Sequence, residues 1–163
     1  MLVCREHSGE AHSGPVVLLR PLRTVIRKKK GRKELKVIQP EEWSKPKGFS
    51  HGVSVDGPGR WIVLAGQTGN ENGTYVADVG KQTGIALNKI IRLLKEAGAG
   101  PEHIVRLTWY LTDREAYAAA GADIGAAWKV TLGRNFPPST LLYVAGLVDP
   151  AAKVEIEVTA FVP

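Results

Sequence analysis

Strict alternation of hydrophobic and polar residues predicts a strand near the end of the chain. Its hydrophobic positions are Val154, Ile156, Val158 and Ala160. A period of two is typical of a strand with one buried face, so Glu155 and Glu157 share the opposite face. A second β-rich run covers residues 139–147, and turn-forming residues at 148–150 separate the two runs. We expect the runs to form a hairpin or to lie as neighbouring strands.

Three earlier segments also have the pattern of strands. A short one covers residues 35–38, and longer ones cover residues 49–55 and 61–65. The two longer segments flank the strong turn signal Asp56-Gly57-Pro58-Gly59, so they are predicted to pair as a hairpin. Residues 66–73 are polar and rich in glycine, which predicts a loop whose backbone amides are available to a ligand.

Helical spacing of hydrophobic residues predicts two helices separated by a strand. Asp78 can cap the first helix, which is expected to run to about residue 97 before Gly98. Residues 104–111 have the pattern of a strand, and the second helix is expected to begin near Asp113 and to run to about residue 132.

The order of these elements favours an α+β sandwich. We expect a mixed sheet of about six strands with both helices on one face. The other face of the sheet then needs a cover, and a second copy of the chain is the simplest one, so we expect an oligomer.

The net charge of +6 is concentrated at the start of the chain. Residues 1–33 contain nine Lys or Arg and two Glu, whereas residues 34–163 contain thirteen Lys or Arg and fourteen Asp or Glu. We therefore expect a basic, disordered N-terminal extension at residues 1–33 and one globular domain at residues 34–163. The extension could be an addition without a function of its own, an organelle-targeting segment or a segment that contacts a polyanion. Binding to nucleic acid is expected only through this extension.

Cysteine content and hydropathy indicate the compartment. The single cysteine, Cys4, cannot form an internal disulfide. The sequence contains no run of about 18 apolar residues, which a membrane-spanning helix would need. We expect a cytoplasmic protein with no membrane partner.

Two candidate chemical motifs are weak. Residues 48–52, Gly-Phe-Ser-His-Gly, match the pattern of a hydrolase nucleophile elbow, but an elbow needs a helix after the serine and a strand pattern follows here. His51 and His103 are the only histidines of the predicted domain, and two histidines without clustered acids or cysteines do not make a metal site. We expect neither a metal nor a cofactor.

Several local strings in residues 49–162 resemble the RidA/YjgF family of small trimeric proteins. They are Leu64-Ala65-Gly66-Gln67, Val105-Arg106-Leu107-Thr108, Leu111-Thr112-Asp113, Phe136-Pro137-Pro138-Ser139-Thr140 and Val154-Glu155-Ile156-Glu157. The resemblance implies a chorismate-mutase-like fold and a homotrimer with ligand clefts between its subunits. It also implies hydrolysis of reactive imines or enamines derived from amino acids, with release of ammonia and without metal or organic cofactor.

The resemblance also implies roles for individual residues. Glu155 matches the acidic residue that orients or deprotonates the attacking water, and it is the predicted catalytic residue. The predicted substrate-binding residues are Phe49, Ala65, Gly66, Gln67, Gly121, Ser139 and Thr140.

Four of these positions depart from the family pattern. The arginine that clamps the substrate carboxylate is Ser139 here, and a serine cannot supply two charged hydrogen bonds. The ligand-facing tyrosine, serine and asparagine of the family correspond to Phe49, Ala65 and Gly121. Each change removes a polar group, so the resemblance implies an atypical substrate.

Three hypotheses remain. The first is a divergent hydrolase of a bulkier or less charged imine or enamine, in which Arg134 or His51 replaces the lost polar contact. The second is a non-catalytic trimer that binds a small molecule or a partner protein. An activity on RNA is the third and weakest hypothesis. The predicted domain carries a net charge of −1, which does not favour binding to the phosphates of RNA.

Overall fold

The computed structural model of the protein describes residues 35–163. The N-terminal extension predicted at residues 1–33 therefore lies outside the described residues. Among residues 35–163, every helix is too short or too polar to span a lipid bilayer.

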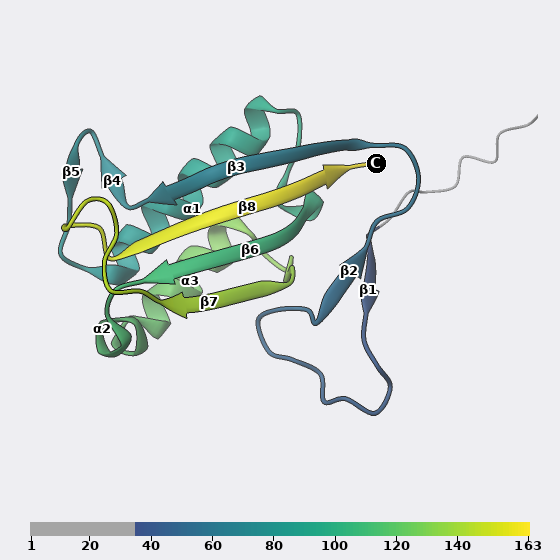
Figure 1. The fold of residues 1–163 in the computed structure, drawn as a ribbon, viewed down its shortest axis with the longest axis horizontal. Coiled ribbons are helices and arrows are strands. Elements are labelled where there is room, and N and C mark those ends of the chain that lie inside the picture. Colours follow the sequence, from purple (N-terminus) through teal and green to yellow (C-terminus); the bar gives the residue numbers. More distant parts are fainter. Residues whose placement is uncertain (1–34) are drawn as a thin grey trace, which may run out of the picture. The chain divides into compact units, whose positions relative to one another are not determined.

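A mixed four-stranded sheet forms the centre of the fold (Figure 1). Its strands are β3 (Arg60–Thr68), β8 (Val154–Val162), β6 (Ile104–Leu111) and β7 (Ser139–Tyr143), in that spatial order. The pairs β3–β8 and β8–β6 are antiparallel, whereas β6–β7 is parallel. The predicted α+β class and mixed sheet are confirmed, although the main sheet has four strands rather than about six.

The helices all lie behind one face of this sheet (Figure 1). They are α1 (Val79–Glu96), α2 (Arg114–Ala119) and α3 (Gly121–Thr131), and a 3-10 turn, η1 (Pro101–His103), precedes β6. The side chain of Asp78 accepts a hydrogen bond from the Lys81 amide (2.7 Å), as expected for an N-cap. Asp113 caps α2 in the same way through the Ala116 amide (2.9 Å).

The predicted second helix is divided in two at Ala120. Its backbone angles there (φ −82°, ψ 7°) leave the α-helical region. Gly121, which follows, has a low helix propensity, so the chain tolerates a change of direction at this point.

The hydrophobic core lies between the helices and the sheet. Leu87, Ile90 and Leu94 of α1 are fully buried against alternate residues of the strands, including Leu107 and Ile156. This burial confirms which residues of the last strand face inward, and it leaves Glu155 and Glu157 on the face away from the helices.

The hairpin predicted at residues 49–65 is wrong. Strand β2 (Gly52–Ser54) pairs with β1 (Lys36–Ile38) in a separate two-stranded sheet, and β3 pairs with β8. Both β3 and β8 have nine residues, so they form a much longer ladder than the three-residue β2 could offer. Gly59, at the end of the turn, packs on the ring of Phe161 in β8, where any larger residue would overlap the ring.

The second predicted pairing is also wrong, because β7 and β8 are not neighbours. Strand β6 lies between them, and β7 ends at Tyr143 rather than at residue 147. Helices α2 and α3 supply the long crossover that a parallel pair such as β6–β7 requires.

The loop predicted at residues 66–73 is largely ordered as strand. After a bulge between Leu64 and Gln67, β3 continues to Thr68. A small hairpin of β4 (Asn70–Glu71) and β5 (Thr74–Tyr75) follows. Its two turn residues, Asn72 and Gly73, have positive φ angles of 52° and 81°, as a tight hairpin turn requires.

Candidate functional site

A pocket of about 690 Å³ lies between the α2–α3 helices, the inner face of β6 and β7, and the loop at residues 47–49. Helix α2 contributes Tyr117, and α3 contributes Gly121, Ile124, Gly125 and Trp128. The α3 residues are three or four positions apart and therefore share one face of that helix. The strands contribute Trp109, Ser139 and Leu141.

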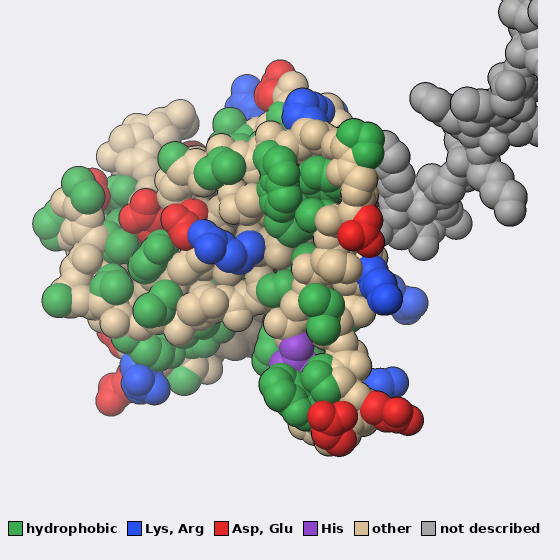
Figure 2. Space-filling view, turned by 45° about the vertical axis from the view of Figure 1, so that its right-hand side comes forward, with side chains coloured by type: hydrophobic (Ala, Val, Ile, Leu, Met, Phe, Trp, Pro, Cys, Tyr) green, Lys and Arg blue, Asp and Glu red, His purple; other side chains and the backbone are tan. Residues whose placement is uncertain are grey.

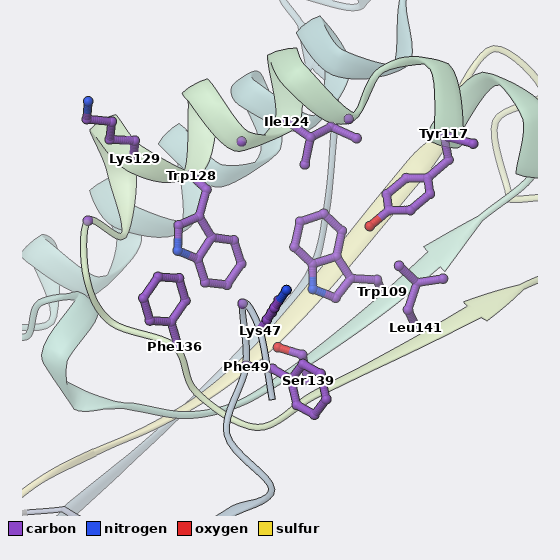
Figure 3. Close-up of a pocket in the computed structure, with 15 residues that line it drawn as sticks. Lys47, Phe49, Trp109, Tyr117, Ile124, Trp128, Lys129, Phe136, Ser139 and Leu141 are labelled. Carbon is purple, nitrogen blue, oxygen red and sulfur yellow. The ribbon is translucent and has the colours of Figure 1, made fainter. Parts of the chain in front are cut away.

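Three nearly parallel aromatic rings line this pocket (Figure 3). The Trp128 ring lies 6.2 Å from that of Trp109, with 13° between their planes, and 5.9 Å from that of Phe136, with 8° between them. Rings stacked directly face to face would be only about 3.5–4.0 Å apart. The rings are therefore not in direct face-to-face contact, and Figure 3 shows them side by side, an arrangement that leaves part of each face uncovered. We call Trp109, Trp128 and Phe136 the aromatic wall.

The polar groups of the pocket are basic or hydroxylic. Lys47 and Lys129 supply amines, and Tyr117 and Ser139 supply hydroxyl groups, while none of the described lining residues is Asp or Glu. Burial, and to a lesser extent the neighbouring Tyr143, raises the pKa of Tyr117 above its usual value. Its phenol consequently stays neutral and can donate a hydrogen bond. The indole N–H of Trp128 is buried without an acceptor in the described part of the chain.

Ser50 fastens the loop that carries Lys47 and Phe49. Its hydroxyl donates a hydrogen bond to the carbonyl of Phe136 (2.6 Å), and its amide donates one to the carbonyl of Pro137 (3.4 Å). Gly48 adopts a positive φ of 81° in this loop, a backbone conformation that glycine takes without steric cost. The serine of the elbow-like motif is thus a structural link, and the chain after it enters β2 rather than a helix.

Replacing Ser50 with alanine is expected to lower the free energy of unfolding by about 1 kcal/mol, because the Phe136 carbonyl loses its side-chain donor. The measurement is urea denaturation of both proteins. Ser54→Ala is the matched control, since the Ser54 hydroxyl makes no hydrogen bond within residues 35–163. An equal loss in both variants would contradict this role of Ser50.

The two histidines of the described chain have structural contacts. His51 lies edge-on to the rings of Trp43 and Phe49, at 5.0 and 5.9 Å. The Nδ1 atom of His103 accepts a hydrogen bond from the Gly100 amide (2.9 Å). Among residues 35–163, no three His, Cys, Asp or Glu side chains are grouped so that they could hold a metal ion.

Glu155 lies on the face of the sheet that the helices leave open. The pairing register places it in a row across four strands, with Thr68 on one side and Tyr110 and then Leu142 on the other. Its carboxylate lies against Gly66, and any side chain at residue 66 would overlap it. Arg106 forms an ion pair with Glu157 (3.3 Å) rather than with Glu155. Figure 2 shows charged side chains among hydrophobic ones on the surface in this view.

The predicted site residues fall into separate groups. Ala65, Gly66 and Thr140 share the open face with Glu155, whereas Phe49, Gly121 and Ser139 line the pocket on the helix side. Ser139 pairs with the core residue Leu107, so Ser139 and Glu155 are on opposite faces of the sheet. The register pairs Gln67 with Ile156, which places it on the helix-covered face and outside the pocket lining.

The sequence did not lead us to several residues that determine the charge and shape of the pocket. Lys47 lines the pocket, whereas Arg134 and His51, the suggested substitutes for the lost arginine, do not. One signal was available, because Lys47 is two residues before Phe49, which was a predicted site residue. The helical spacing of Gly121, Gly125 and Trp128 was a second signal.

Comparisons with known proteins agree on one family. Residues 42–162 match the family model described as Endoribonuclease L-PSP. The Escherichia coli K12 protein YoaB, described as a RutC family protein, is 30% identical over 115 residues, which are 68% of this chain and 97% of YoaB.

Two solved structures resemble the fold. One is YyfB from Yersinia pestis, a protein of unknown function of the Rid family, with 34% identity, a TM-score of 0.66 and coverage of 79% of this chain and 99% of YyfB. The other is Rv2704 from Mycobacterium tuberculosis, of the YjgF/YER057c/UK114 family, with 31% identity, a TM-score of 0.52 and coverage of 71% and 87%.

Proposed function

This chain belongs to the endoribonuclease L-PSP family, which includes the Rid and YjgF proteins, and from this premise we propose that it hydrolyses a reactive imine or enamine. The carbon of an imine is electrophilic, so water adds to it once a base removes a proton from the water. The resulting carbinolamine releases ammonia and leaves a carbonyl compound. An enamine enters the same route after protonation at carbon.

The environment of the Glu155 carboxylate is the main observation that supports this proposal. Its carboxylate is half-buried on the open sheet face, beside the bare backbone of Gly66. Arg106 pairs with Glu157, and no Lys or Arg forms an ion pair with Glu155 within residues 35–163. A carboxylate without a cationic partner is free to accept a proton from water, which supports its role as the general base.

We further propose that the protein works as a homotrimer. Trp61 and Val63 of β3 are 56% and 77% exposed in the single chain, and large exposed hydrophobic residues of this kind mark surfaces that a partner covers. Glu155 and Ser139 lie on opposite faces of the same sheet, so one chain cannot bring them together. A second subunit whose open face meets the pocket would place its Glu155 beside a bound substrate.

A non-catalytic binding protein is the second candidate. The composition of the pocket favours it, because five of the fifteen lining residues are aromatic and Ser139 stands where the family has its clamping arginine. Under this alternative the trimer binds a small molecule without converting it.

Ammonia release from imines distinguishes the two functions. The substrates are freshly generated 2-aminoacrylate and a panel of bulkier imines, tested with the wild type, Ser139→Arg and the uncharged control Ser139→Met. We expect wild-type activity on bulkier imines, and a gain on 2-aminoacrylate in Ser139→Arg alone, because a guanidinium can bind its carboxylate in two hydrogen bonds. If the wild type hydrolyses none of the panel, the binding function replaces the enzyme.

A further inference from the structure

We propose that the pocket selects a planar aromatic molecule bearing one carboxylate, which lies flat on the aromatic wall with its carboxylate at Lys47. The inference rests on the proposed function for the claim that this molecule is a substrate, namely an imine carrying an aryl group. The binding itself rests on the shape and charge of the pocket.

The aromatic wall sets the shape of the ligand. Its planes differ by only 13° and 8° between neighbours, so the three ring faces point in nearly the same direction. A flat ring can contact the uncovered parts of two rings at once in the offset geometry that aromatic pairs prefer. A saturated ring is puckered and would touch the same surface at fewer points.

The charged side chains of the pocket determine the sign of the ligand's charge. Figure 3 shows the Lys47 side chain extending into the pocket beside Trp109, whereas the side chain of Lys129 points away from the rings. Since none of the described lining residues is acidic, the Lys47 ammonium has no carboxylate partner inside the pocket. A ligand carboxylate would supply one.

Two further donors lie at the same end of the pocket. Ser139 and Trp109 occupy diagonal positions on adjacent parallel strands and face the helix side, since Ser139 pairs with Leu107 and Trp109 pairs with Leu141. The Trp109 indole N–H makes no hydrogen bond within the described chain. The Ser139 hydroxyl donates only to the Pro137 carbonyl, over 3.2 Å, and can turn to a ligand. The carboxylate is therefore met by one cation and two neutral donors.

Isothermal titration calorimetry on the full chain tests this inference with three probes: 2-naphthoate, its neutral amide 2-naphthamide, and the saturated cyclohexanecarboxylate. We expect 2-naphthoate to bind most tightly. Lys47→Met should weaken its binding about fivefold, the effect of one partly exposed ion pair, and should leave 2-naphthamide unchanged. Lys45→Met is the matched control, because Lys45 is two residues away on the same loop and does not line the pocket.

Titrations of a second variant test the contribution of the aromatic wall. Phe136→Leu should weaken both naphthalene probes about fivefold through the lost ring contact, without changing cyclohexanecarboxylate. Equal affinity for 2-naphthoate and cyclohexanecarboxylate, equal effects of Lys47→Met and Lys45→Met, or no binding of 2-naphthoate would each overturn the inference.

These outcomes are separate from the test of the proposed function. Binding of 2-naphthoate without ammonia release from any imine would reject the hydrolase and keep the aromatic ligand. Hydrolysis of aliphatic imines by a protein that does not bind 2-naphthoate would reject the ligand class and keep the hydrolase.

Discussion

Replacing Glu155 with glutamine is expected to lower kcat/KM for imine hydrolysis by about 10²–10⁴-fold, the usual contribution of a general base. Glutamine keeps the size and the hydrogen-bonding capacity of the side chain but cannot accept the proton of the attacking water. Because the side chain is half-buried and lies against Gly66 without overlap, the exchange should leave folding unchanged. The measurement is initial rates of ammonia release on the best imine of the panel.

Glu157→Gln is the matched control for this prediction. Glu157 lies two residues along β8, on the same face, and its carboxylate is paired with Arg106 (3.3 Å). Loss of a partly exposed ion pair of this kind costs little, so activity should remain close to that of the wild type. A comparable loss of activity in both variants, or full activity in Glu155→Gln, would remove Glu155 from the mechanism.

The second large effect is expected in the core, from replacement of Leu94 with alanine. Leu94 is a fully buried residue of α1. Truncation of such a leucine leaves a cavity that lowers the free energy of unfolding by about 2–5 kcal/mol. Leu93→Ala is the matched control, since Leu93 is its neighbour on the same helix and is 39% exposed. Urea denaturation of both variants measures the difference. Similar midpoints would contradict the orientation of α1 on the sheet.

The elements that sequence reasoning placed correctly are those with a strong local period. The helix after Asp78 and the strand at residues 104–111 are confirmed, because each shows its buried face through spacing alone. Spacing also identified the inward-facing residues of the last strand. It gives no information about which strand lies alongside, however, and both predicted pairings failed for that reason: β3 and β6 are the neighbours of β8.

The candidate site was only partly predictable for the same physical reason. The resemblance directed attention to Glu155 and Ser139, but the register across β6, β7 and β8 decides that they face opposite ways. The aromatic wall combines one residue from β6, one from α3 and one from the loop after α3. Residues brought together from such distant segments leave no contiguous pattern in the sequence.

The contact between Gly66 and Glu155 has a consequence for anyone who redesigns this protein. The space that a side chain at residue 66 would need is already filled by the Glu155 carboxylate. A side chain introduced at residue 66 would therefore displace the Glu155 carboxylate unless residue 155 is changed with it. A directed-evolution library that varies residue 66 alone would mostly sample displaced carboxylates, whereas joint variation of both positions can reach new arrangements of the site.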